Sequence, residues 1–140
     1  MTCRILLLTH GGWGEMLISS AQMIIGTIDF IDEIALQPID TLREYTLRVE
    51  QYYQNLVKQL DISQLLIITD IFGGTPNNVA AVLAKQYPDM ITVFTGLNLP
   101  LLIESCSQVI ASNQIDYATL QQNCEHSVFN ISQRIRMGGE

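Results

Sequence analysis

A histidine and an aspartate stand at matching positions after two apolar runs of the sequence. His10 follows "ILLLT" and Asp70 follows "LLIIT", so each is the first strongly polar side chain beyond a segment typical of a buried strand. If the two strands are neighbours, the carboxylate can accept a hydrogen bond from one ring nitrogen and leave the lone pair of the other nitrogen free to attack. The pair therefore predicts a nucleophilic histidine that is oriented by a carboxylate.

Glycines follow both residues, in "HGGWG" and in "DIFGGTP". Gly11, Gly12 and Gly74 remove side-chain volume, so backbone N–H groups can approach an anion closely. Thr75 brings a hydroxyl to an expected helix start, where it can cap the helix or donate to a phosphoryl oxygen. The two loops are therefore candidate anion-binding loops.

Each of these residues also has a purely structural interpretation. A histidine before two glycines is common in turns, and Asp70 can simply brace its loop. Thr75 followed by Pro76 is typical of a helix start, with the threonine as the cap. Trp13 can pack over a helix start rather than stack on a ligand. The functional interpretation is favoured because all these groups are expected to meet at one place.

Spacing and composition argue against several other chemistries. The chain has no P-loop, no dinucleotide-binding glycine motif and no G-x-S-x-G serine motif. Two histidines far apart, and three scattered cysteines without metal-ligand spacing, argue against a metal site. The formal net charge of −7, with only 7 lysines and arginines, argues against nucleic-acid binding. We therefore expect no metal, no cofactor and no nucleic-acid partner.

The same features indicate a soluble protein of a reducing compartment. Hydrophobic residues make up 48% of the 140 residues, but the apolar runs are far shorter than the roughly 20 residues that a membrane span needs. No signal-peptide cleavage site follows the first apolar run. Cysteines this far apart are expected to remain free thiols.

Apolar patterning predicts alternating strands and helices. Strands are expected at 3–9, 33–37, 64–69 and 90–96, and helices at 15–25, 42–60, 76–87, 101–111 and 116–126. Buried strands that alternate with helices predict an α/β domain, with a doubly wound, mainly parallel sheet covered by helices on both faces. Ligands of such sheets bind beyond the carboxyl ends of the strands, where "THGGWG", "TDIFGGTP" and "TGLNLP" should converge.

The end of the chain has a different pattern. Residues 128–137 alternate between mostly apolar and polar side chains with a period of two. This alternation predicts a strand with one solvated face, which lies at a sheet edge or pairs with another chain.

Three segments together carry a resemblance to a known family. "LLLTHGGWGEMLISSAQMIIG", "IITDIFGGTPNNVA" and "TGLNLPLLIE" resemble the enzyme IIA domain of the mannose class (mannose, fructose, sorbose) of the bacterial sugar phosphotransferase system. The resemblance covers essentially the whole chain, 1–140, as one domain. It implies that His10 is phosphorylated, that Asp70 orients it and that Thr75 contacts the phosphoryl group. Side chains expected to line the crevice are Trp13, Phe72 and Asn98.

The resemblance also implies partners. His10 would accept the phosphoryl group from the histidine phosphocarrier protein and pass it to a IIB component, which serves a membrane IIC/IID complex in sugar uptake. Such a phosphotransferase is cytoplasmic and meets the membrane only through its partners. The family fold is a homodimer that exchanges an antiparallel strand, so residues 128–137 are the candidate exchanged strand.

Three alternatives remain open at this point. The domain also occurs inside transcriptional regulators, where phosphorylation controls activity, although Met1 and the lack of a DNA-binding segment favour a separate carrier. The phosphotransfer subunit of dihydroxyacetone kinase is related, but its loops are less similar to "DIFGGTPNN". A non-catalytic ligand-binding or interaction domain could share the fold without taking up phosphate.

Overall fold

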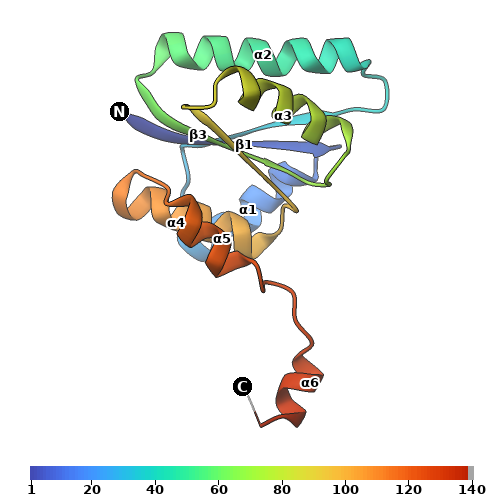
Figure 1. Ribbon diagram of the computed structural model, residues 1–140, viewed down its shortest axis with the longest axis vertical. Coiled ribbons are helices and arrows are strands. Elements are labelled where there is room, and N and C mark those ends of the chain that lie inside the picture. Colours follow the sequence, from blue (N-terminus) through green and yellow to red (C-terminus); the bar gives the residue numbers. More distant parts are fainter. Residues whose placement is uncertain (139–140) are drawn as a thin grey trace.

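The computed structural model describes residues 1–138 of the chain (Figure 1). The strands of this part are β1 (Thr2–His10), β2 (Ile31–Leu36), β3 (Ile62–Thr69) and β4 (Ile91–Thr95). The helices are α1 (Trp13–Ile25), α2 (Leu42–Gln59), α3 (Thr75–Gln86), α4 (Leu99–Ser112), α5 (Tyr117–Cys124) and α6 (Ile131–Arg136). The last two residues of the domain expected over 1–140 lie outside the described residues.

The strands form a parallel sheet in the order β2-β1-β3-β4. β1 pairs with β2 on one side and with β3 on the other, so the direction of the chain across the sheet reverses after β2. This reversal places the carboxyl ends of β1 and β3 side by side at the switch point. The predicted doubly wound, mainly parallel fold is confirmed.

Helices cover both faces of the sheet (Figure 1). On β1, Ile5 and Leu7 belong to the core shared with α1, α4 and α5, whereas Leu6 and Leu8 belong to the core shared with α2 and α3. All four side chains are fully buried. Two covered faces explain why the strand is almost continuously apolar rather than alternating.

Helix α2 shows how the sequence specifies a covering helix. Its buried side chains recur every three or four residues: Tyr45, Val49, Tyr53 and Leu56. The backbone N–H of Glu44 donates to Oγ1 of Thr41 at 3.1 Å, so the predicted cap is present. Leu42 and Leu60, which continue the predicted stripe, lie beyond the packed part of the helix and are exposed.

The strand predicted at residues 128–137 is wrong for the chain on its own, because Ile131–Arg136 form the helix α6. Asn130 caps this helix by accepting a hydrogen bond from the N–H of Gln133 at 3.0 Å. A lone strand would leave its backbone polar groups without a ladder, whereas a helix satisfies them internally. The local cap therefore prevails over the alternating pattern.

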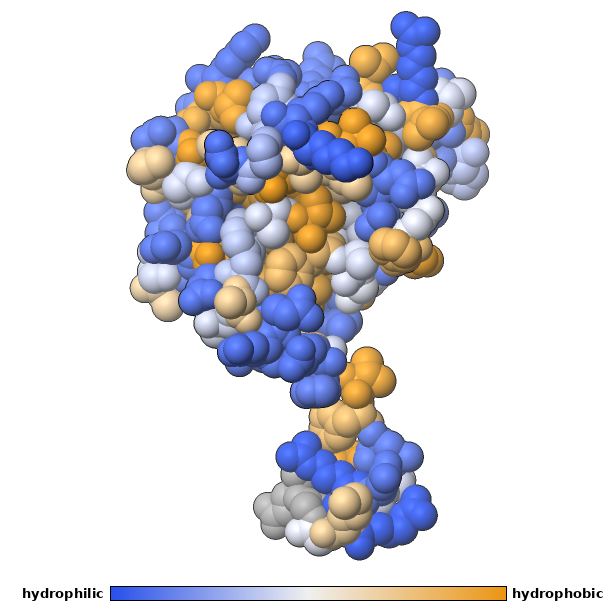
Figure 2. All heavy atoms as spheres, in the orientation of Figure 1, coloured by the Kyte–Doolittle hydropathy of each residue, from blue (hydrophilic) through white to orange (hydrophobic). Residues whose placement is uncertain are grey.

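We call residues 128–137 the tail. Its helix lies apart from the sheet and the other helices (Figure 1), and none of the residues of α6 is buried. Figure 2 shows apolar side chains exposed among polar ones on this part of the surface. Within residues 1–138, no helix has both the length and the apolar composition that crossing a membrane requires.

Candidate functional site

His10 and Asp70 are in contact at the carboxyl ends of β1 and β3. The ring Nδ1 of His10 lies 2.9 Å from Oδ2 and 3.1 Å from Oδ1 of Asp70. The backbone N–H of His10 donates to the same Oδ2 at 2.7 Å. Because an ionised carboxylate only accepts hydrogen bonds, Nδ1 carries a proton and Nε2 keeps its lone pair in neutral imidazole. The geometry therefore leaves Nε2 available to attack.

The two side chains differ in exposure. The side chain of Asp70 is 4% exposed, whereas the side chain of His10 is 44% exposed. A buried group that orients and an accessible ring that reacts suit a residue whose reaction partner arrives on another molecule.

Asp70 is held in its charged form by several donors. Burial raises the pKa of the carboxyl, but the hydrogen bonds from His10 and Trp13 together outweigh burial and lower this pKa below its ordinary value. Trp13 Nε1 donates to Oδ2 at 3.4 Å, and the N–H of Ile71 donates to Oδ1 at 2.9 Å. Trp13 therefore braces the carboxylate, a role that its place in the sequence did not indicate.

Gly74 lies against the ring of His10. A Cβ atom at residue 74 would come within 2.9 Å of Cε1 and 3.5 Å of Nε2 of the ring. Real Cβ atoms essentially never make the shorter of these contacts, so a side chain here would push the ring aside. The second glycine loop therefore limits the positions that the ring of His10 can take.

Gly11 and Gly12 form an open turn directly after His10. Gly11 has a φ of 68°, a left-handed conformation that glycine adopts at little cost. Its N–H donates to the carbonyl of Leu36 at 2.8 Å, which ties the turn to the end of β2. A Cβ on either glycine would meet no described atom within 4 Å, so there is open space above the turn.

Two helices begin at this site without a side-chain cap. α1 follows Gly12 and α3 follows Gly74, and neither N-cap makes a side-chain hydrogen bond. The other described helices all have a capping side chain: Thr41, Asn98, Asp116 and Asn130. Free N–H groups at the positive end of a helix attract anions. The two uncapped helices are thus the two that flank His10.

Thr75 is the first residue of α3, and Gly74 is the N-cap. The interpretation of Thr75 as the cap is therefore wrong, and its hydroxyl is not used for capping. Thr75 is partly buried next to Gly74, whereas Phe72, in the same loop, is 81% exposed. The loop thus carries one hydroxyl and one large exposed apolar side chain within two residues of Gly74, which lies against the ring.

Asn98 has a structural task at the end of β4. Its side-chain oxygen accepts from the N–H of Leu101 at 2.8 Å, and its amide nitrogen donates to Oγ of Ser127 at 3.1 Å. Both polar groups of the side chain are therefore engaged in capping α4 and in holding the segment after α5. The third loop is tied to the site through Gly96, whose N–H donates to the carbonyl of Thr69 at 3.0 Å.

Thr9 and Glu33 also lie beside the first glycine turn, and no sequence motif pointed to them. Oγ1 of Thr9 lies 2.7 Å from Oε2 of Glu33 and 2.9 Å from the carbonyl oxygen of Gly11. The signal available in the sequence was a threonine within a buried strand and a glutamate within another strand. Such polar residues in buried strands need partners, and the structure supplies them.

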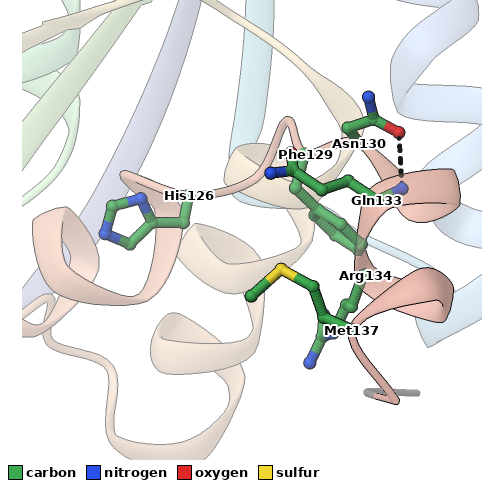
Figure 3. A pocket seen from close by; sticks show the side chains of 6 residues that line it. All are labelled: His126, Phe129, Asn130, Gln133, Arg134 and Met137. Atoms are coloured by element: carbon green, nitrogen blue, oxygen red, sulfur yellow. Dashed lines mark hydrogen bonds between the residues drawn. The ribbon is translucent and has the colours of Figure 1, made fainter.

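A cavity of about 620 Å³ lies on the tail and not at His10 (Figure 3). Its walls are His126, Phe129, Asn130, Gln133, Arg134 and Met137. The guanidinium of Arg134 stands over the ring of Phe129 at 5.1 Å from the ring centre.

Comparison with known proteins connects this arrangement to one family. The family model described as "PTS system fructose IIA component", where PTS is the sugar phosphotransferase system, matches residues 4–120. The match runs from β1 into α5 and stops before the tail.

Relatives with assigned roles show the same similarity. The "PTS system mannose-specific EIIAB component" of Escherichia coli (strain K12) is 31% identical over 110 residues, which cover 75% of this chain and 31% of that protein. The "PTS system fructose-specific EIIA component" of Bacillus subtilis (strain 168) is 34% identical over 103 residues, which cover 70% of this chain and 64% of that protein. The chain thus spans about a third of the length of the first relative.

A solved structure extends the similarity to nearly the whole chain. The PTS IIA protein associated with the fucose utilization operon from Streptococcus pneumoniae has a TM-score of 0.82 and 25% sequence identity. The superposition covers 96% of this chain and 97% of that one.

Proposed function

The chain belongs to the family of IIA components of the sugar phosphotransferase system, and from this premise we propose that it is a phosphoryl carrier whose phosphorylated residue is His10. It takes the phosphoryl group from the histidine phosphocarrier protein and passes it to a IIB component, in support of sugar uptake by a membrane complex. The observation that carries this proposal is the His10–Asp70 pair, set between two glycine-started helices that lack side-chain caps.

The first transfer uses Nε2 of His10 as the nucleophile. Its lone pair attacks the phosphorus atom of the phosphohistidine on the phosphocarrier protein. A nitrogen–phosphorus bond forms at Nε2 while the one on the donor breaks, and the donor nitrogen keeps the electron pair. The proton on Nδ1 stays in the hydrogen bond to Asp70. In the second transfer His10 keeps the electron pair of its own broken bond, and the phosphoryl group moves to the nucleophile of the IIB component.

Backbone groups hold the phosphoryl oxygens. Among residues 1–138, no lysine or arginine forms an ion pair or hydrogen bond with His10 or Asp70. The N-termini of α1 and α3, at Gly12 and Gly74, supply N–H donors instead, with the hydroxyl of Thr75 beside them. Partial charges stabilise a phosphohistidine less than full positive charges do, so the group stays easy to pass on.

Exposed apolar side chains on the two segments that follow His10 and Asp70 form an apolar rim that suits a protein partner. The rim consists of Trp13, Met16, Ile71 and Phe72, all exposed, from the start of α1 and the loop before α3. Large apolar and aromatic side chains of this kind are enriched where proteins dock. Because the phosphocarrier protein and the IIB component must both reach His10, they would use this rim in turn.

The tail supports a further part of the proposal, the dimer. Its apolar side chains are exposed in the single chain, and β4 has an edge without a partner strand among residues 1–138. A second subunit whose tail changes from helix to strand would cover this edge and bury the alternating apolar face. Residues 128–137 therefore remain the candidate for exchange between subunits.

The alternatives are less well supported. The family match and the relatives, which are named as sugar phosphotransferase components, favour a carrier over a regulator domain or a dihydroxyacetone kinase subunit. A non-catalytic domain would have no use for an oriented histidine whose ring is left accessible.

Phosphorylation with a labelled donor tests the proposal. The chain is incubated with the phosphocarrier protein and its phosphoryl source, and an acid-labile, base-stable label is expected. His10→Ala should take up none, whereas His126→Ala, which removes the other histidine, should be labelled normally. Label on His10→Ala, or no label on the unmodified chain, would show the assignment to be wrong.

A further inference from the structure

Thr9 and Glu33 form a partly buried polar unit that the proposed transfer does not use. Thr9 is fully buried on β1 directly before His10, and Glu33 lies on the neighbouring strand β2. Oγ1 of Thr9 stands between Oε2 of Glu33, at 2.7 Å, and the carbonyl oxygen of Gly11, at 2.9 Å. The unit therefore links the edge strand of the sheet to the turn that follows the reactive histidine.

The chain leaves out a side chain to make room for this unit. Gly14 is buried in the first turn of α1, where glycine weakens a helix relative to alanine. A Cβ there would collide with Oε2 of Glu33 and would come within 3.0 Å of Cγ2 of Thr9. The Glu33 carboxyl thus occupies the space that a side chain at residue 14 would take.

Because the peptide bond is planar, the contact between Thr9 and the carbonyl of Gly11 also defines the direction of the N–H of Gly12. In a trans peptide the C=O of one residue and the N–H of the next point in opposite directions, and no cis bond is present among the described residues. Because the carbonyl of Gly11 points inward to Thr9, the N–H of Gly12 points away from Thr9. No described residue accepts a hydrogen bond from this N–H.

We propose that Thr9 and Glu33 are positioning residues that aim the N–H of Gly12 at the phosphoryl group on His10. The one hydroxyl proton of Thr9 is shared between the carboxylate of Glu33 and the carbonyl of Gly11, and this shared hydrogen bond ties the Gly11–Gly12 peptide plane to β2. This inference rests on the proposed phosphorylation of His10. It adds to that function the means by which a glycine turn with open space around it keeps one anion-binding donor in place.

The hydroxyl of Thr9 has one proton and two acceptors within reach. A polar group on residue 33 that accepts from this hydroxyl, or donates to it, keeps the hydroxyl beside the carbonyl of Gly11. A glutamine can do either, whereas a leucine can do neither. Glu33→Gln should therefore preserve the unit and Glu33→Leu should break it, with similar side-chain volume in both variants.

The test follows the backbone amide of Gly12 by NMR in the full chain, before and after phosphorylation. In the chain without substitutions, the amide proton signal of Gly12 should move to a higher chemical shift on phosphorylation, because a phosphoryl oxygen becomes the acceptor of this N–H. Thr9→Ser and Glu33→Gln should keep this change. Thr9→Val and Glu33→Leu should lose most of it, and their rate of phosphoryl uptake should fall about tenfold with an unchanged KM for the phosphocarrier protein.

Thr69→Val is the matched control. Thr69 is equally buried and stands directly before Asp70, but its hydroxyl bonds Thr95 and Asn77 instead of the glycine turn. The response of Gly12 should survive in this variant. If Thr9→Val does not fold, the comparison of Glu33→Gln with Glu33→Leu in the same spectra tests the positioning role.

The outcomes separate this inference from the proposed function. An unmodified chain that takes up no phosphate on His10 overturns both. A chain that is phosphorylated on His10 while the Gly12 signal stays in place overturns the positioning role alone. The same holds if Thr9→Val and Glu33→Leu respond as the unmodified chain does.

Discussion

One oxygen of Asp70 holds His10 at two points. Oδ2 accepts the backbone N–H of His10 at 2.7 Å and lies 2.9 Å from the ring Nδ1 of the same residue. The carboxylate therefore determines both where β1 ends and how the ring is turned. A residue with these two tasks cannot be replaced without affecting the geometry of the reaction.

Asp70→Asn should slow phosphoryl uptake by about 10²-fold, because a small misplacement of reacting groups has an effect of this size. If the amide oxygen of asparagine takes the place of Oδ2, its NH₂ group takes the place of Oδ1 and cannot accept from the N–H of Ile71, so the side chain has to shift. Rapid-quench measurement of labelled chain gives the rate. Asp89→Asn, an exposed residue before β4 at the opposite edge of the sheet, is the control and should react normally. Equal rates for the two variants would contradict the orienting role.

Acid should destabilise the fold in part through Asp70. Burial raises the pKa of this carboxyl, but the hydrogen bonds from His10 and Trp13 outweigh it, so the folded pKa lies below the ordinary value of 3.8. Since the unfolded chain then binds the proton more tightly, Asp70 stabilises the fold above that value, and this contribution is lost as the pH falls through the folded pKa.

The measurement is the free energy of unfolding of the chain and of Asp70→Asn at a series of pH values. The difference between them should be largest above about pH 4 and should shrink as the solution is acidified. The lowered pKa of Asp116, which its hydrogen bond with Thr119 produces, is present in both chains and cancels. A difference that does not vary with pH would show that the carboxylate is not stabilised as described.

Gly74→Ala should displace the ring of His10 and reduce phosphoryl uptake by about 10²-fold. The new Cβ would come within 2.9 Å of Cε1, while φ at Gly74 is −73°, which alanine adopts without strain. The loss of stability should stay near 1 kcal/mol, the usual effect of an alanine at an N-cap.

Gly73→Ala, in the same loop, should lower the stability of the fold but leave the ring of His10 in place. A Cβ at Gly73 would meet no described atom within 4 Å, but φ is 81°. Its melting temperature should fall by the equivalent of about 1–2 kcal/mol, with the ring signals of His10 little changed. If Gly74→Ala leaves the His10 ring signals and the uptake rate unaltered, the contact with the ring is not what requires a glycine.

Removal of the tail should affect assembly rather than the fold of the subunit. No residue of α6 is buried, so a chain that ends before Phe129 should keep nearly the same far-UV circular dichroism as the full chain. Light scattering should then report a monomer for the shortened chain and a dimer for the full chain. A shortened chain that remains a stable dimer would show that the tail is not the exchanged element.

The elements that could be predicted are those with a local signature. The buried run before His10, the three- and four-residue spacing of Tyr45 and Val49 in α2, and the cap at Thr41 all act within a few turns or one strand, so they can be recognised without the fold. The secondary structure of the tail could not be predicted in this way. Its alternation and its cap at Asn130 favour different structures, and the outcome depends on whether a partner strand is present.

The chemical groups at the ends of β1 and β3 can be read directly from the order of the residues. A histidine, an aspartate and two glycine pairs after apolar strands were enough to predict a reactive ring and an anion-binding edge. How these groups are held depends on contacts that form when the chain is folded. Trp13 bonds Asp70, Gly74 backs the ring, and Glu33 reaches Gly11 through Thr9. Such contacts join residues from different strands and loops, and their distances follow from how the sheet and its helices pack.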